Sequence, residues 1–198
     1  MFRRKTAIHW VAAMAAILSI VPASAGEENL DALQSEARRA AMRLLEQIRG
    51  EVNRELDQTG PIRAITVCKY SAPEISSAIS RQTGMRVTRV SLRPRNRMLG
   101  EPDSWEQKGL LDFEKRLAKG EKIETLEASQ VVSEPTGRYY RYLKAIPMAQ
   151  PCLACHGPVA GIPEGVKAQL AADYPHDRAV NFQQGQVRGA VSVKKPLD

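Results

Sequence analysis

An α+β fold is predicted by three features of the sequence. Apolar residues recur every three or four positions through most of residues 29–83, as they do on one face of a helix. Segments rich in Val, Ile and Tyr dominate the second half, and two of them flank a hairpin-turn sequence, PTG, at 135–137. Helices that come first and strands that come later favour a small antiparallel sheet with flanking helices.

The first 25 residues are predicted to be an export signal that lies outside this fold. Basic residues at 3–5 precede an apolar run at 7–21, and the sequence PASA at 22–25 offers the small residues that signal peptidase accepts. An uncleaved anchor is the alternative, but the run is short for a membrane span of about 20 residues. Residues 26–198 are then expected to form one exported domain, periplasmic or beyond, with no stable membrane span after cleavage.

Composition and charge exclude several classes of protein. The 198 residues are 43% hydrophobic and 26% charged, which fits neither a disordered chain nor a multi-span membrane protein. The formal net charge of +7 falls to +4 in the 173 residues left after cleavage, because residues 1–25 hold three basic and no acidic side chains. No segment combines clustered basic residues with aromatic ones, so nucleic acid is not an expected partner.

A long amphipathic helix is predicted over residues 29–56, where apolar positions are spaced by three and four. A helix of thirty residues is about 45 Å long, more than a compact domain of this size needs. Its outer part is therefore expected to project or to pair with a second copy. The apolar positions are Leu30, Leu33, Ala37, Ala40, Ala41, Leu44, Ile48, Val52 and Leu56.

A second helix is predicted over residues 62–71. One of its faces carries Ile62, Ile65 and Cys68. Pro73 cannot donate a backbone hydrogen bond, so this helix is expected to end or kink just after Cys68. The sequence SAPE at 71–74 has the form of a capping box, which predicts a new helix that runs to Gly84.

The rest of the chain is predicted to alternate between strands, loops and two helices. A strand over 86–93 is followed by a loop over 94–103 and an amphipathic helix over 105–119. The arms of the predicted hairpin are 124–133 and 138–146. A short helix over 164–172 and a last strand over 189–193 complete the expected fold.

The motif with a chemical meaning is Cys152-Leu153-Ala154-Cys155-His156, the C-x-x-C-H pattern of c-type haem attachment. Each cysteine can form a thioether with one haem vinyl group, and the adjacent histidine is then placed to bind the iron. Three alternatives stay open: a thioredoxin-like redox pair, a zinc site that includes the third cysteine and another histidine, and a disulfide between Cys152 and Cys155. The surrounding Pro/Gly-rich loop and the histidine favour haem.

The third cysteine, Cys68, is the leading candidate for the second iron ligand. An unpaired thiol in an oxidising compartment is a liability unless something occupies it, and this one lies on an apolar helix face at a predicted break. The other candidates are more commonly surface or packing residues. They are His176, Met42, Met85, Met98 and Met148.

An ordered set of short motifs resembles a family of exported single-haem c-type proteins with a PAS-like fold. The motifs are AITVC at 64–68, APEI at 72–75, RN at 95–96, WE at 105–106, CLACHG at 152–157, YP at 174–175, Gly185 and RGAVSV at 188–193. The resemblance implies His156 as proximal ligand, Cys68 as distal thiolate, and Cys152 and Cys155 as thioether anchors. The chain departs from the family at 97–100, where the family tends to have Pro and a second Asn, and at Asn181, where Gly is usual.

These observations predict a monohaem c-type cytochrome that binds one covalent haem c and senses redox state, or a diatomic gas, when Cys68 leaves the reduced iron. A periplasmic electron-transfer cytochrome with fixed ligands is the alternative. A peroxidase-type enzyme is less favoured, because a thiolate would fill the distal site and no second histidine is placed for acid–base catalysis. Output is expected through a separate redox or signalling partner, or through a homodimer of the N-terminal helix. Proposed partners for the haem propionates are Arg95, Lys69, Tyr139 and Tyr140.

Overall fold

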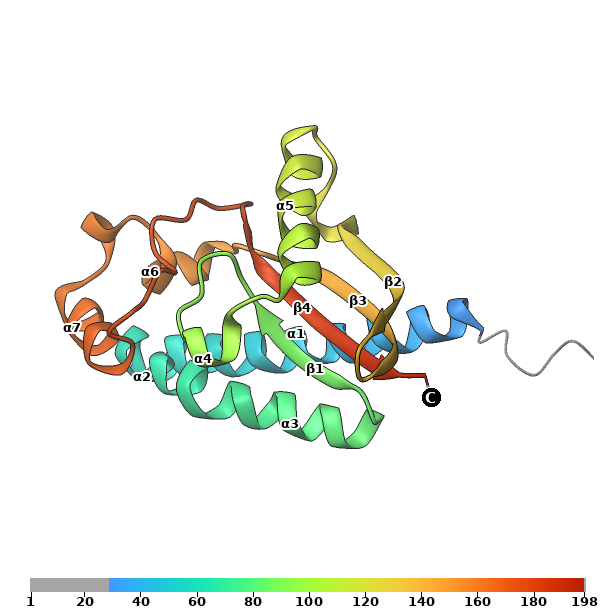
Figure 1. Cartoon of the computed structure of the whole chain (residues 1–198). Coiled ribbons are helices and arrows are strands. Elements are labelled where there is room, and N and C mark those ends of the chain that lie inside the picture. Colours follow the sequence, from blue (N-terminus) through green and yellow to red (C-terminus); the bar gives the residue numbers. More distant parts are fainter. Residues whose placement is uncertain (1–28, 198) are drawn as a thin grey trace, which may run out of the picture.

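The structure, a computed structural model, describes residues 29–197 and confirms the α+β class (Figure 1). The predicted signal at 1–25 lies outside the described residues. One antiparallel sheet has the strand order β1-β4-β3-β2. Its strands are β1 (Arg86–Val90), β2 (Glu127–Glu134), β3 (Gly137–Pro147) and β4 (Val187–Pro196). The last strand of the chain, β4, is therefore an inner strand of the sheet. The sheet is complete only when this C-terminal segment pairs between β1 and β3.

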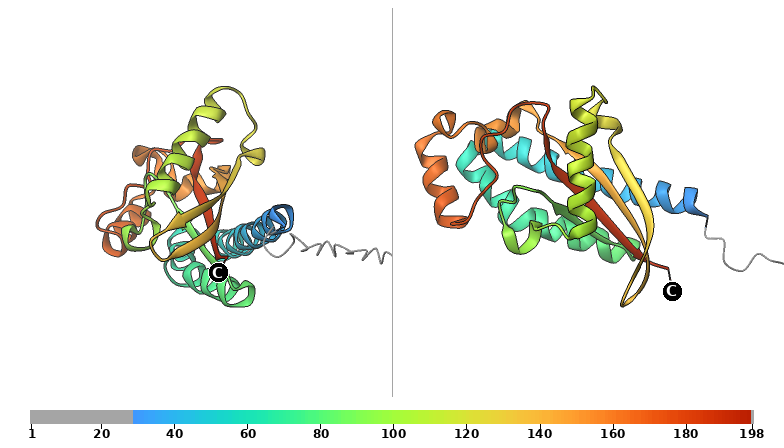
Figure 2. Two further views of the ribbon diagram at one scale, coloured as in Figure 1. Left: turned by 45° about the vertical axis from the view of Figure 1, so that its right-hand side comes forward. Right: turned by 45° about the horizontal axis from the view of Figure 1, so that its top comes forward.

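The predicted long helix is confirmed as α1 (Leu30–Thr59), which begins where the side chain of Asn29 accepts a hydrogen bond from the Ala32 amide at 3.0 Å. Three alanines on its buried face allow it to approach the sheet closely, where it packs on Tyr142 and its neighbours. These alanines are Ala37, Ala40 and Ala41. Figure 2 shows α1 along one face of the sheet, with its first turns reaching past the sheet edge.

The second helix does not end after Cys68, so the predicted end is wrong, but the helix geometry does change at this point. Helix α2 (Pro61–Thr66) continues through a π-helical turn, η1 (Val67–Ser71), into α3 (Ala72–Thr83). Because Pro73 lacks an amide hydrogen, the wider π-turn absorbs the missing bond without ending the helix. Ser71 has helical angles and makes no side-chain cap, so the predicted capping box is also wrong. The predicted stop is confirmed, since Gly84 has a left-handed φ of 67°.

The opposite face of the sheet is covered by α5 (Ser104–Ala118), whose Leu110 and Phe113 pack on Leu143 of β3. Asp103 and Glu106 form a capping box at its start, a D-x-x-E signal that the sequence analysis overlooked. A short helix, α4 (Arg97–Gly100), lies within the predicted loop 94–103. The two faces of the sheet thus support two separate apolar cores.

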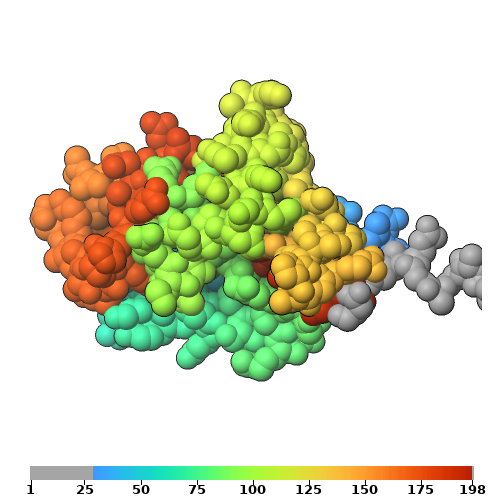
Figure 3. Space-filling view, viewed as in Figure 1, coloured from blue at the N-terminus to red at the C-terminus, as the bar shows by residue number. Residues whose placement is uncertain are grey.

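The C-x-x-C-H segment lies in a lobe at one end of the sheet. This lobe consists of η3 (Gln150–Cys152), α6 (Leu153–His156), η4 (Val159–Gly161) and α7 (Glu164–Asp173). Outside the lobe, a short helix, η2 (Ile123–Thr125), precedes β2. Figure 3 shows the lobe against the 94–103 segment and α2 on one face of the molecule. No helix among residues 29–197 is long and apolar enough to cross a membrane.

Candidate functional site

A cavity of about 610 Å³ lies where the lobe, the 61–83 helix, α1 and the ends of β1 and β4 meet. This volume is within the range of cofactor pockets, and its walls are largely apolar. The apolar lining includes Leu45, Ile48, Val52, Leu56, Ile65 and Ile146. The cavity can therefore enclose a flat, mostly apolar group.

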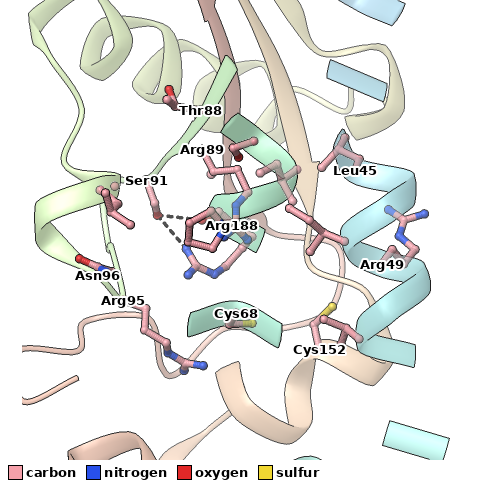
Figure 4. Close-up of a pocket in the computed structure, with 18 of the residues that line it drawn as sticks. Leu45, Arg49, Cys68, Thr88, Arg89, Ser91, Arg95, Asn96, Cys152 and Arg188 are labelled. Carbon is pink, nitrogen blue, oxygen red and sulfur yellow. Dashed lines mark hydrogen bonds between the residues drawn. The ribbon is translucent and has the colours of Figure 1, made fainter. Parts of the chain in front are cut away.

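All four predicted site residues line this one cavity. Figure 4 labels two of them, Cys68 and Cys152. Cys152, Cys155 and His156 come from η3 and α6, and Cys68 comes from the π-turn far upstream in the sequence. The three cysteines are free thiols, so the alternative disulfide is not formed. Within residues 29–197 no three His, Cys, Asp or Glu side chains converge closely enough to hold a metal ion.

His156 is held in the form that a metal ligand requires. Its Nδ1 lies 2.7 Å from the carbonyl oxygen of Ala179, and because a carbonyl only accepts, the ring hydrogen must be on Nδ1. Burial, together with the positive charges of Arg188 and Arg95, holds the pKa of His156 well below its usual range. The ring is therefore neutral and keeps the lone pair on Nε2 for a ligand.

Arg95 fixes the loop around this histidine. Its Nη2 donates to the carbonyls of Cys155 at 2.5 Å and Ala179 at 3.3 Å, and its Nε pairs with Asp177 Oδ2 at 2.9 Å. The other oxygen of Asp177 accepts from the Ala179 amide at 2.7 Å. Arg95, which was predicted to meet a haem propionate, lines the cavity, and its guanidinium also orients the carbonyl that His156 uses.

The three other predicted propionate partners lie outside the cavity lining. Lys69 Nζ pairs with Asp173 Oδ1 of α7 at 2.5 Å, which ties the Cys68 turn to the lobe. Tyr139 bonds to Thr136 in the hairpin, and Tyr140 is buried against α1. The structure does not bring these three residues to the cavity, because Lys69 faces Asp173 and both tyrosines lie at the hairpin end of β3, away from the end that lines the cavity.

Cys68 is the one predicted second ligand that reaches the cavity. Met85 and Met148 are each 1% exposed in apolar clusters, and Met98 is 93% exposed on α4. Met42 and His176 are also exposed, and none of these five residues lines the cavity. A π-turn often marks a functional position in a helix, and here it carries Cys68.

Of the basic residues in the cavity wall, the sequence suggested only Arg95 as a functional residue. The lining of the cavity contains six arginines and no Asp, Glu or Lys. They are Arg49, Arg81, Arg86, Arg89, Arg95 and Arg188. They come from five separate segments, so no local sequence pattern shows that they converge. The wall is thus apolar and cationic.

Comparisons with known proteins agree with this description. The model of the Tll0287-like family matches residues 27–196. Among solved structures, the crystal structure of the cyanobacterial heme-protein Tll0287 matches with a TM-score of 0.59 and 22% identity, over 88% of this chain and 98% of that chain. No curated protein matches. At 22% identity, this structural similarity supports the fold of the chain and not a particular function.

Proposed function

The chain belongs to the Tll0287-like family, and on this premise we propose that it is an exported, single-haem c-type cytochrome that senses redox state. The observation that carries the proposal is that Cys152, Cys155, His156 and Cys68 line one apolar cavity. The related heme-protein Tll0287 and the C-x-x-C-H motif support haem as the ligand.

The residues present fit a covalently held haem. Cys152 and Cys155 are free thiols beside the cavity, available for thioethers. His156 offers a neutral imidazole, and Cys68 offers sulfur as the second ligand. When bound, haem would supply an iron that changes both oxidation state and ligand affinity.

Cys68 is the group through which the chain would respond. A thiolate would favour ferric iron, so a His/Cys pair would give a low reduction potential, and on reduction the Cys68 sulfur would take up a proton from solvent and leave as the thiol. The π-turn that carries Cys68 is tied to α7 through Lys69 and Asp173, and α2 packs on α1. Release of Cys68 would therefore displace contacts with both the lobe and α1. The proposal gives the protein no catalytic role.

Haem attachment is tested by producing the protein with a c-type maturation system. We expect one haem per chain that resists acid–organic extraction, and loss of that resistance in Cys152→Ser/Cys155→Ser. A chain that leaves the maturation system without haem would refute the proposed function.

The ligand pair is tested by electron paramagnetic resonance of the ferric protein. We expect a low-spin thiolate signal that disappears in Cys68→Ala and stays in Met98→Ala, whose side chain is exposed and lies outside the cavity lining. An unchanged signal in Cys68→Ala would remove Cys68 from the iron.

Sensing is separated from electron transfer by reducing the wild-type protein under carbon monoxide. A sensor that releases Cys68 would bind carbon monoxide and change its spectrum. A spectrum that carbon monoxide leaves unchanged would indicate fixed ligands and an electron-transfer cytochrome.

A further inference from the structure

Most arginines of the cavity lack an acidic partner among residues 29–197. Arg95 pairs with Asp177, but the other five form no ion pair within residues 29–197. Arg49, Arg81 and Arg86 are exposed, so water solvates their charges. Arg89 and Arg188 are only partly exposed, and both line the cavity.

Arg188 is held with its guanidinium toward the cavity. Nη1 donates to Ser91 Oγ at 3.0 Å and to the Arg93 carbonyl at 3.3 Å, and Cζ lies 5.4 Å from the centre of the Phe182 ring. These contacts leave Nε and Nη2 without a partner among the described residues. Figure 4 shows Arg89 and Arg188 together on the sheet side of the cavity, and Cys68 and Cys152 on its other side.

The protein alone destabilises the charge of Arg188. Burial, then the nearby charges of Arg95 and Arg89, lower the pKa of Arg188 to about 9. A half-buried guanidinium normally has a carboxylate or phosphate partner, because the uncompensated charge is costly to desolvate. An anionic ligand bound between Arg89 and Arg188 would reduce the repulsion between these two cations.

We propose that Arg89 and Arg188 form an anion subsite that binds the propionate carboxylates of haem, an inference that rests on the proposed function. The planar guanidinium can bind a carboxylate through two parallel hydrogen bonds. The subsite would place the charged edge of the porphyrin at the ends of β1 and β4.

The test uses the full chain produced without haem and titrated with ferric mesoporphyrin, which lacks vinyl groups and so binds reversibly. Its dimethyl ester is the second ligand, because it has the same ring but no carboxylates. We expect the wild type to bind the diacid at least about tenfold more tightly than the ester, as two charge-assisted bonds imply. In Arg89→Gln/Arg188→Gln this ratio should fall close to one.

Arg39→Gln/Arg43→Gln is the matched control, because it removes two exposed arginines of α1 that do not line the cavity, and it should keep the ratio. If the glutamine variant does not fold, as judged by circular dichroism, Arg89→Lys/Arg188→Lys should fold and show a reduced ratio. A full ratio in the folded Arg89/Arg188 variant, or its loss in the control, would overturn the subsite while haem binding stands. Failure of the wild type to bind either porphyrin would overturn the proposed function as well.

Discussion

Asn181 shows at the scale of one residue how the loop after the C-x-x-C-H motif is held. Its φ of 60° lies in the left-handed region, which disfavours most side chains but is tolerated by asparagine. Its side-chain Oδ1 accepts a hydrogen bond from the backbone amide of Val159 at 3.0 Å, and its backbone amide donates to the Gly157 carbonyl at 2.8 Å. The structure thus explains why asparagine can stand where the family usually has glycine.

Two substitutions at this position should behave differently. Asn181→Ala should lower the free energy of unfolding by about 1–2 kcal/mol, because alanine is strained at this φ and loses the side-chain hydrogen bond. Asn181→Gly should be close to neutral, since relief of strain offsets the lost bond. Urea unfolding of the three proteins measures both effects, and equal stability of the alanine variant would contradict this account.

Arg95 is a positioning residue in this structure, because it acts on His156 through the Ala179 carbonyl. Arg95→Ala should lower stability by about 3–5 kcal/mol, since it leaves buried partners unpaired, among them Asp177. It should also shift the ferric resonance signal and the reduction potential, which a purely structural effect would leave unchanged. Arg178→Ala, an exposed arginine of the same loop, is the control and should alter neither. A stable Arg95→Ala protein with the wild-type signal would contradict the positioning role.

At the scale of the elements, two helical glycines report how closely each helix packs. A Cβ added to Gly109 of α5 would lie 2.4 Å from Leu143 Cδ1, in a fully buried part of the core. A Cβ added to Gly50 of α1 would meet nothing within 4 Å. The same substitution should therefore have opposite effects at these positions.

Gly50→Ala should raise the free energy of unfolding by about 0.5–1 kcal/mol, because alanine favours the helix without any clash. Gly109→Ala should lower it by about 1–2 kcal/mol, because overpacking outweighs the gain in helix propensity. Urea unfolding of both variants measures the difference. A stabilised Gly109→Ala protein would show that α5 can move away from β3 without loss.

The helices were predictable where their apolar spacing is strong, as in α1 and α5. The C-x-x-C-H motif and Cys68 as a candidate iron ligand were also predictable from the sequence. The helical path through Pro73 was not, because a π-turn depends on how the whole segment packs and not on the proline alone. Arg89 and Arg188 were missed for a different reason. They meet only because β4 pairs with β1 across the sheet, and long-range pairing leaves no local pattern.

At the scale of the whole molecule, Glu127 joins α1 to two strands. Its carboxylate accepts from Arg38 of α1 and from the Tyr142 hydroxyl at 2.7 Å, and Lys144 Nζ lies 4.0 Å away. The hydrogen bond from Arg38, assisted by Tyr142 and the nearby charges, lowers the pKa of Glu127 to about 2. The helix that lines the cavity at one end is thus fixed to the sheet at its other end.

This link makes stability depend on pH in a definite direction. The lowered pKa means that the folded state favours the carboxylate, so the contribution of Glu127 is complete above pH 4.5, the ordinary value, and is lost as pH falls toward 2. Glu127→Gln should lower the free energy of unfolding by about 1–2 kcal/mol at pH 7. The difference from wild type should shrink between pH 4.5 and 3, because protonation then removes the same interaction from the wild type.

Glu46→Gln serves as the control, because Glu46 is exposed on the same helix. Its stability should follow that of the wild type at every pH. A Glu127→Gln difference that stays constant from pH 7 to pH 3 would mean that the carboxylate charge does not fix α1 to the sheet. The attachment of α1 to the sheet would then depend on its apolar face and on its other polar contacts, such as the ion pair between Glu36 of α1 and Lys195 of β4 at 2.9 Å.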